Sequence, residues 1–318
     1  MKAILYHYVR GPDARFPRPG GIRRLEPESF RRQLDHLQQR WHFPSAAELI
    51  EMLSGRREAP EDVAVLTFDD GLRSHYDVVY PELRSRGLTG VFYIAAAPHT
   101  QGEVLPVHAI HHLLGAVAPE VVLRDAMAWV DGHPDALRAE ARDDYRQRYR
   151  GEVDAPAGAL KRMINGRRYL HTDARWALTA SLLQRHLPQL EPSMIYLSPQ
   201  EIQDMDAHGM IMGAHSIRHD SLSELSAAEQ REEIFESLSW VAQHCRGSAR
   251  TFAYPYGGAE SFDERSVDLL LEAGVDWCFS LEPEDVAPHH LADPRARQAL
   301  PRYDCRHFPH GAEVGGLT

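Results

Sequence analysis

The amino-acid sequence predicts an α/β protein with a parallel sheet, interrupted by a helical insertion. Short apolar runs alternate with amphipathic helices along residues 1–97 and again along residues 196–318, as they do in successive βα units. Between them, residues 98–195 carry helical patterns and no convincing strand pattern. Two of the apolar runs end in carboxylates or histidines, and strand ends are where α/β proteins place their active sites.

The composition is that of an ordinary globular protein. The 318 residues are 43% hydrophobic and 25% charged, and the formal net charge of −11 argues against a nucleic-acid partner. The N-terminal apolar run is too short for a signal peptide, and no run approaches the roughly 18 apolar residues of a membrane span. The three cysteines lie far apart and indicate neither a disulfide framework nor a zinc knuckle. We therefore expect a cytoplasmic protein without a membrane span.

The first elements follow in chain order. Residues 1–9 form an apolar run typical of a strand, and His7 lies near its C-terminal end. Apolar side chains repeat at helical spacing along residues 30–41. Ser45 begins a capping box, which predicts the start of a second, shorter helix. This unit leads directly into the next strand.

The second strand ends in two adjacent carboxylates. Residues 63–68 are almost continuously apolar, which predicts a strand buried on both faces, and Asp69, Asp70 and Gly71 follow at once. Neighbouring like charges raise each other's proton affinity, so one can act as a base while the other needs a cation to stay ionised. Asp-Asp-Gly is also ordinary turn chemistry, and this stretch alone leaves both interpretations open.

The insertion comes after one more βα unit. The helix beyond the aspartates ends at Gly87, and residues 90–94 form the next strand. Helical patterns then dominate, beginning with residues 109–117. His108 and His111 are polar groups in this otherwise apolar run, and burying them without partners would be costly. The segment either walls the pocket, with these histidines reaching substrate, or packs on the flank as a dimer surface.

The alternation resumes with Ser198, which begins a capping box, and a short apolar run at residues 210–212 follows that helix. His215 and His219 come directly after this run. Two histidines four residues apart can reach one ion, and with one aspartate they form the three-ligand open site of a catalytic metal. Roughly one such pair is expected by chance among 19 histidines, so its position at a strand end is what counts.

The remaining elements complete the pattern. A third capping box begins at Ser226, and its helix is followed by a strand-like run that is broken at residues 255–258. Further strands are expected at residues 275–279 and near residues 300–303. The count gives about seven βα units, which periodicity alone does not assign to a barrel or to an open sheet.

Three segments together resemble the polysaccharide deacetylase family, also called the NodB homology family or carbohydrate esterase family four. They are Thr-Phe-Asp-Asp-Gly at residues 67–71, His-Ser-xx-His at residues 215–219, and Pro-Tyr-Gly at residues 255–257. The resemblance covers residues 1–97 and about 196–304. It implies a distorted (β/α)7 barrel, with residues 98–195 as an all-helical insertion.

The resemblance also implies a chemistry. A divalent metal ion, with Zn²⁺ as the first choice, would be held by Asp70, His215 and His219. Asp69 would be the general base that takes a proton from the attacking water, and the backbone N–H of Tyr256 would help to hold the oxyanion. The implied activity is metal-dependent hydrolysis that removes an N-acetyl group from an amino-sugar or glycan precursor; an N-formyl group is not excluded.

The sequence departs from the family in two places. The arginine that orients the catalytic aspartate would fall on Ala253, so Arg250 or Arg302 would have to replace it. The late histidine that supplies the family's acid has no clean match, and His307 is only a loose candidate. His7 is the alternative acid, since its strand end would face the same mouth, although a lone histidine in a strand is more often a core residue.

Two further sets of expectations concern partners and alternatives. Tyr254, Arg302, His108 and His111 are candidate substrate-binding residues, and a homodimer is possible. A sugar-binding relative without catalysis is one alternative, because the family's arginine and late histidine are missing; the intact Asp69 argues against it. A two-His-one-carboxylate iron oxygenase uses the same ligand types but predicts a β-sandwich.

Overall fold

The computed structural model describes residues 1–18, 22–149, 155–247 and 249–315. The chain folds into two compact units. The first comprises Met1–Gly11, Leu25–Gln101 and Ser193–Glu313. The second comprises Pro12–Arg24, Gly102–Pro192 and Val314–Thr318.

Seven parallel strands form the centre of the first unit, in the spatial order β6-β5-β4-β3-β2-β1-β7. Leu300, just before β7, forms a parallel bridge with Phe279 of β6, so the last stretch of chain meets both edges of the sheet. This confirms the predicted distorted (β/α)7 barrel. The strands are β1 (Lys2–Tyr6), β2 (Ala64–Phe68), β3 (Gly90–Ile94), β4 (Ile211–Ala214), β5 (Thr251–Ala253), β6 (Trp277–Phe279) and β7 (Tyr303–Asp304).

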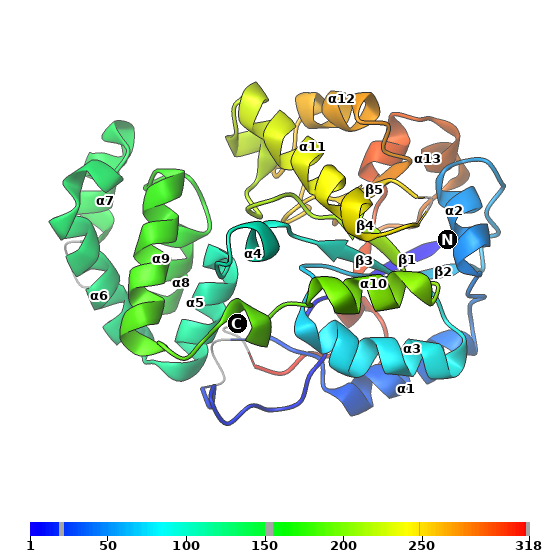
Figure 1. Ribbon diagram of the computed structural model, residues 1–318, viewed down its shortest axis with the longest axis horizontal. Helices are drawn as coiled ribbons and strands as arrows, with labels where there is room; N and C mark the ends of the chain where they lie inside the picture. The colour runs from blue at the N-terminus through cyan, green and yellow to red at the C-terminus, as the bar shows by residue number, and fades with distance from the viewer. Residues whose placement is uncertain (19–21, 150–154, 248, 316–318) are drawn as a thin grey trace. The chain divides into compact units, whose positions relative to one another are not determined.

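Helices surround these strands, with α3 and α10 on one side and α11 and α12 on the other (Figure 1). All three predicted capping boxes are present, at Ser45, Ser198 and Ser226. Gly87 ends α3 in the left-handed conformation, as its position after the helix predicted. The helices of this unit are α1 (Pro27–Gln38), α2 (Ala46–Leu53), α3 (Tyr80–Arg86), α4 (Ala97–Thr100), α10 (Pro199–Ala207), α11 (Ala227–His244), α12 (Glu264–Glu272) and α13 (Pro288–Ala292).

Side chains alternate between the two faces of the curled sheet, and this alternation decides which residues can reach the barrel mouth. One set packs with the surrounding helices, and it includes Phe68, Ala214 and Phe252. The other set, which includes Val65 and Ile211, packs in the barrel interior. Residues that continue the interior set beyond the strand ends therefore face the mouth.

The second unit is helical, as predicted for the insertion, with an apolar core of its own. Its N-terminal part was not predicted from the sequence: Phe16 packs its ring 4.7 Å from that of His112, and the Arg18 N–H donates to the Gly115 carbonyl. These contacts group residues 12–24 with the helices. The helices are α5 (Pro106–Ala116), α6 (Pro119–Gly132), α7 (Arg142–Tyr149), α8 (Pro156–Ile164) and α9 (Thr172–His186).

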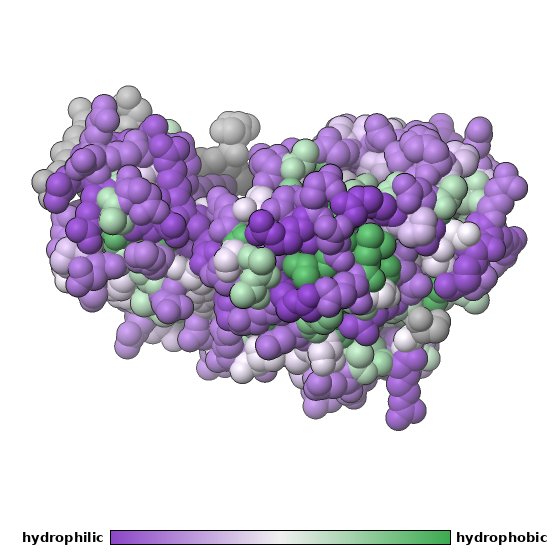
Figure 2. Space-filling model, turned by 90° about the horizontal axis from the view of Figure 1, so that it is seen from above, coloured by the Kyte–Doolittle hydropathy of each residue, from purple (hydrophilic) through white to green (hydrophobic). Residues whose placement is uncertain are grey.

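The surface in Figure 2 is largely hydrophilic, with small hydrophobic groups between the polar side chains. Among the described residues, no helix is both long and apolar enough to cross a membrane.

Candidate active site

Four side chains that continue or belong to the interior set meet at the C-terminal ends of the barrel strands. His7 follows β1, Asp69 follows β2 and His215 follows β4, while Arg302 lies between Leu300 and β7. Asp69, His215 and Arg302 are buried, and His7 is half-buried. The mouth of the barrel is therefore lined by ionisable groups rather than by the apolar side chains of the interior.

Arg302 forms a bidentate ion pair with Asp69. Its Nη1 and Nη2 atoms donate to the two carboxylate oxygens of Asp69, each at 2.8 Å. Nη1 also lies 3.3 Å from the Thr67 hydroxyl, and Nε donates to the Ser280 carbonyl at 2.9 Å. With its donors used in this way and only 1% of its surface exposed, Arg302 fixes the orientation of the Asp69 carboxylate.

The sequence left two arginines as replacements for the family's motif arginine, and the structure selects Arg302. Arg250 is exposed, and its backbone N–H donates to Asp276. The predicted substrate contact of Arg302 is not supported, because its guanidinium is buried against Asp69.

The charge balance of the site keeps Asp69 ionised and favours a cation beside it. Burial alone would raise the pKa of Asp69, but the positive charges of Arg302 and His215 outweigh it and lower that pKa below the ordinary value. Burial would likewise lower the pKa of His215, whereas Asp69 and Asp70 raise it above the ordinary value. The two carboxylates thus create a negative potential where the imidazoles point.

Asp70, His215 and His219 converge on one point, as the sequence predicted for metal ligands. Within the described residues they form a buried group whose ligand atoms all lie within 4.8 Å of one another. The Nε2 atoms of His215 and His219 lie 3.4 Å and 3.3 Å from Oδ1 of Asp70. A charge-assisted hydrogen bond would be shorter, about 2.7–2.9 Å.

The donor set fits a divalent ion. Ligand atoms at roughly 2.0–2.2 Å from a tetrahedral zinc ion lie about 3.3–3.6 Å apart, which matches the distances around Asp70. The Nδ1 atom of His215 lies 2.8 Å from the Ala253 carbonyl oxygen, so Nδ1 carries the hydrogen of the neutral ring and Nε2, on the side of Asp70, is the atom that would bind a metal ion. Three protein ligands of this kind leave further positions open, as catalytic sites do.

The third motif contributes Tyr256, which takes a left-handed backbone conformation with φ 64°. Its ring centroid lies 4.9 Å from that of His219, and the side chain is 37% exposed. Tyr256 therefore borders the group formed by Asp70, His215 and His219, and its backbone role stays a prediction.

Tyr254 is not at the site, contrary to the prediction that it binds substrate. It is 1% exposed, its hydroxyl donates to the Gln298 carbonyl, and its ring stacks on Phe262 with the centroids 3.9 Å apart. The reason is the alternation of the strand: Tyr254 lies on the same face as Phe252, which packs against the helices.

His7 is the better placed of the two candidate acids. Its imidazole is close enough to Asp69 that its positive charge helps to lower the pKa of that carboxylate, after burial, Arg302 and His215 have made their larger contributions. His307 is exposed in a short turn, with Nδ1 3.0 Å from the Asp304 carbonyl oxygen. The structure therefore favours His7, whose acid role stays a prediction.

The other two candidate substrate residues belong to the second unit. His108 is buried, and its ring centroid lies 6.0 Å from that of His111. Their role in substrate binding stays a prediction.

Two buried polar residues of the site region were not predicted. His75 begins a π-helical turn, and its Nε2 lies 2.9 Å from the His7 carbonyl oxygen. Glu233 of α11 is 1% exposed and binds the chain between His215 and His219. Helical spacing places Glu233 with Gln230 and Ser237 rather than with the apolar Ile234, so no apolar pattern in the sequence marked it as buried.

A sequence model described as polysaccharide deacetylase matches residues 162–277. This stretch includes His215 and His219 but not Asp69 or Asp70, which the fold brings to the same place. No curated protein matches the sequence.

Solved structures with similar folds include three proteins. The deacetylase PplD of Streptococcus pyogenes, in complex with acetate, has a TM-score of 0.59 at 13% identity, over 96% of this chain and 91% of that chain. IcaB of Ammonifex degensii has a TM-score of 0.53 at 17% identity, over 95% of this chain and 90% of that chain. A de-N-acetylase of Aggregatibacter actinomycetemcomitans has a TM-score of 0.53 at 13% identity, over 95% and 93%. At these identities the likeness establishes the fold.

Proposed function

We propose that this chain is a NodB-type polysaccharide deacetylase, a metal-dependent hydrolase that removes an N-acetyl group from an amino-sugar or glycan precursor; the family-model match and the shared fold support this. The observation that carries the proposal is that a candidate base and a candidate metal-binding group lie side by side at the barrel mouth. Asp69, oriented by Arg302, is next in sequence to Asp70, which converges with two histidines. A base held beside a metal-binding group is what hydrolysis of an unreactive amide requires.

Each residue has a role that its surroundings support. A divalent ion, when bound by Asp70, His215 and His219, supplies the Lewis acid that polarises an amide carbonyl and acidifies a water molecule. Asp69 is ionised at neutral pH and accepts the proton of the attacking water. The Tyr256 backbone N–H is assigned the role of hydrogen-bond donor to the developing oxyanion.

The leaving amine needs a proton, and we assign its donor to His7. Cleavage of the amide C–N bond then yields acetate and the free amine of the sugar. The His75 imidazole holds the backbone of His7 through its carbonyl oxygen, which supports a fixed position for this acid.

The test compares the two adjacent aspartates in purified protein supplied with Zn²⁺ and assayed for acetate release on a panel of acetylated amino sugars. Asp69→Asn keeps the shape and removes the proton acceptor, so turnover should fall roughly 10²–10⁴-fold with metal content nearly unchanged. Asp70→Asn should lose the metal. Full activity in both variants, or no acetate from any substrate with the metal site loaded, would refute the proposal.

The alternatives gain no specific support. A sugar-binding relative without catalysis was suggested by the missing arginine, but Arg302 makes the contact with the aspartate that the arginine would make. An iron oxygenase was expected to have a β-sandwich, and the fold is a β/α barrel. The identity of the metal, a cytoplasmic location and a homodimer stay predictions.

A further inference from the structure

The two histidines of the metal group are joined by a short loop with an unusual backbone. Ser216 and His219 both take left-handed conformations, with φ 61° and 59°. Inside the loop, the His219 N–H donates to the Ser216 hydroxyl oxygen at 3.0 Å. On one side, the N–H groups of Ala96 and Ala97, where the chain passes from β3 into α4, donate to the Ser216 and Ile217 carbonyls.

The other side of the loop is held by one carboxylate of α11. Oε2 of Glu233 accepts the backbone N–H of Ile217 at 2.7 Å and that of Arg218 at 2.9 Å. Its Oε1 accepts from Nη1 of Arg218 at 3.1 Å. Glu233 therefore binds two of the three residues between His215 and His219 through their backbone N–H groups, and one of them, Arg218, also through its side chain.

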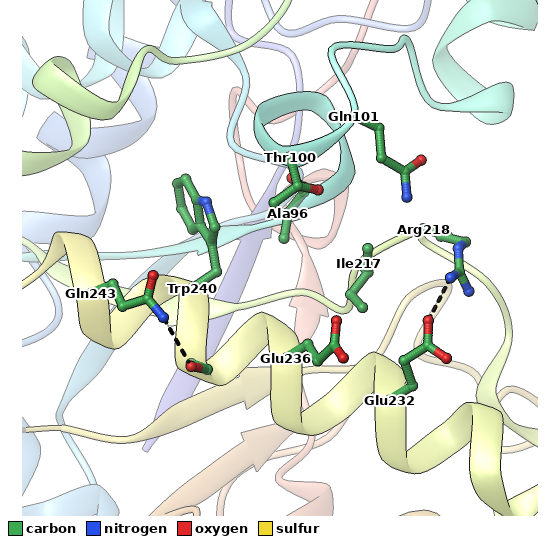
Figure 3. A pocket seen from close by; sticks show the side chains of 10 residues that line it. Ala96, Thr100, Gln101, Ile217, Arg218, Glu232, Glu236, Trp240 and Gln243 are labelled. Carbon is green, nitrogen blue, oxygen red and sulfur yellow. Dashed lines mark hydrogen bonds and ion pairs between the residues drawn. The ribbon is translucent and has the colours of Figure 1, made fainter.

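The neighbouring Glu232 provides a natural contrast. It lies one residue earlier on α11 and accepts from the Arg218 side chain, at 2.6 Å, as Figure 3 shows. Its side chain is 42% exposed and borders an open cleft of about 490 Å³, which Ile217 and Trp240 also line. The two glutamates share a helix and a partner, but only Glu233 reaches the backbone of the loop.

A buried carboxylate at this position is unfavourable on its own. Burial raises the pKa of Glu233 to about 7, although the N–H groups of Arg218 and Ile217 lower it. A charged side chain is unusual at a buried position, and Glu233 lies on the buried side of α11 with the uncharged Gln230 and Ser237. An apolar replacement, however, would leave the two loop N–H groups buried without acceptors.

We propose that Glu233 is a positioning residue of the metal site: by binding the backbone of Ile217 and Arg218, its carboxylate sets the spacing and direction of His215 and His219. The inference rests on the proposed function in that it takes Asp70, His215 and His219 as metal ligands. Partners behind the ligands of a metal site typically change its affinity roughly 10–100-fold when they are lost.

The test measures metal binding without substrate, by competition of the metal-free protein with a chromophoric chelator for Zn²⁺ and by the visible spectrum of the Co²⁺-loaded protein. Glu233→Leu should weaken metal binding roughly 10–100-fold and alter the Co²⁺ spectrum. Glu232→Leu is the matched control and should leave both unchanged. Glu233→Gln keeps one oxygen for the two backbone N–H groups but turns an amide N–H₂ toward Arg218, so its loss should be intermediate.

Thermal unfolding of the metal-free proteins measures how much stability each variant loses. A general loss of stability would not change the Co²⁺ spectrum of the loaded site, so a changed spectrum indicates a positioning role. Equal metal affinity and equal spectra for Glu233→Leu and Glu232→Leu would overturn the inference. If Glu233→Leu does not fold, the comparison of Glu233→Gln with Glu232→Gln decides in the same way. A wild-type protein that binds no metal, or whose binding survives His215→Ala, would instead refute the proposed metal site and the inference with it.

Discussion

Replacing Arg302 with methionine should move the acidic limb of the pH–rate profile toward neutral pH. Asp69 acts as a base only when it is ionised, so activity is lost as the pH falls through its pKa. Burial raises this pKa and the Arg302 guanidinium is the largest of the influences that lower it. Without the guanidinium the pKa of Asp69 should rise, and the activity should require a higher pH.

The geometry sets the size of the effect. The guanidinium donates to both oxygens of Asp69 at 2.8 Å, and the pair is almost fully buried. An opposite charge at this range shifts a carboxyl pKa by roughly 1–3 units, or about 1.4–4 kcal/mol, so the acidic limb should move by a similar number of pH units. Breaking the buried pair should also destabilise the fold by roughly 3–5 kcal/mol.

The stability effect has a defined pH window. A carboxyl whose pKa is lowered in the folded state stabilises the fold above its unfolded pKa, about 3.9 for aspartate, and that stability is lost as the pH falls through the folded pKa. The excess stability of wild type over Arg302→Met should therefore be greatest near neutral pH and shrink in acid.

The assay is the pH dependence of kcat/KM for acetate release, together with denaturant unfolding at several pH values. Arg302→Lys keeps the positive charge but not the bidentate geometry, so its acidic limb should shift less than that of Arg302→Met. Arg250→Met removes an exposed arginine and should leave the profile unchanged. An unchanged acidic limb in Arg302→Met, in protein that is folded and loaded with metal, would refute the reasoning.

Two other outcomes are expected. Gly213→Ala places a Cβ 2.5 Å from the Tyr93 ring in the barrel interior, so the free energy of unfolding should fall by about 1–3 kcal/mol. The control is Gly11→Ala, whose added Cβ meets no atom within 4 Å. An equal loss of stability in this control would contradict the packing argument. If the helix with His108 and His111 rims the pocket, acetate release from a short acetylated amino-sugar conjugate should exceed that from polymeric chitin, and equal turnover would count against it.

Features that depend on neighbouring residues could be predicted from the sequence. The strand at residues 90–94 was placed with the observed bounds, Gly90–Ile94, and all three capping boxes form both of their hydrogen bonds. A capping box needs only four consecutive residues, so its pattern is complete in the sequence. The grouping of Asp70 with His215 and His219 also followed, because parallel strand ends meet at one edge.

Features that depend on barrel closure could not be predicted. Asp69 and Arg302 are separated by 233 residues, and nothing in their local sequence distinguishes Arg302 from Arg250. The choice is made when the chain around Leu300 meets Phe279 of β6 and places Arg302 inside the barrel. Tyr254 is different, because the alternation from Phe252 already indicated that it faces the helices.

Several residues of the site have backbone conformations that favour glycine, yet they are not glycine. Six described residues other than glycine have positive φ angles, and four of them are Asp70, Ser216, His219 and Tyr256. Glycine would relieve this strain, which is of order 1–2 kcal/mol for each residue. Glycine would also remove the carboxylate and the imidazole that converge at 3.3 Å, and the hydroxyl that accepts the His219 N–H. A strained loop keeps its shape only when its surroundings hold it, and here the hydrogen bonds to Ala96, Ala97 and Glu233 do so. The same reasoning places the greatest sensitivity to mutation in the residues that hold the loop, as well as in the ligands themselves.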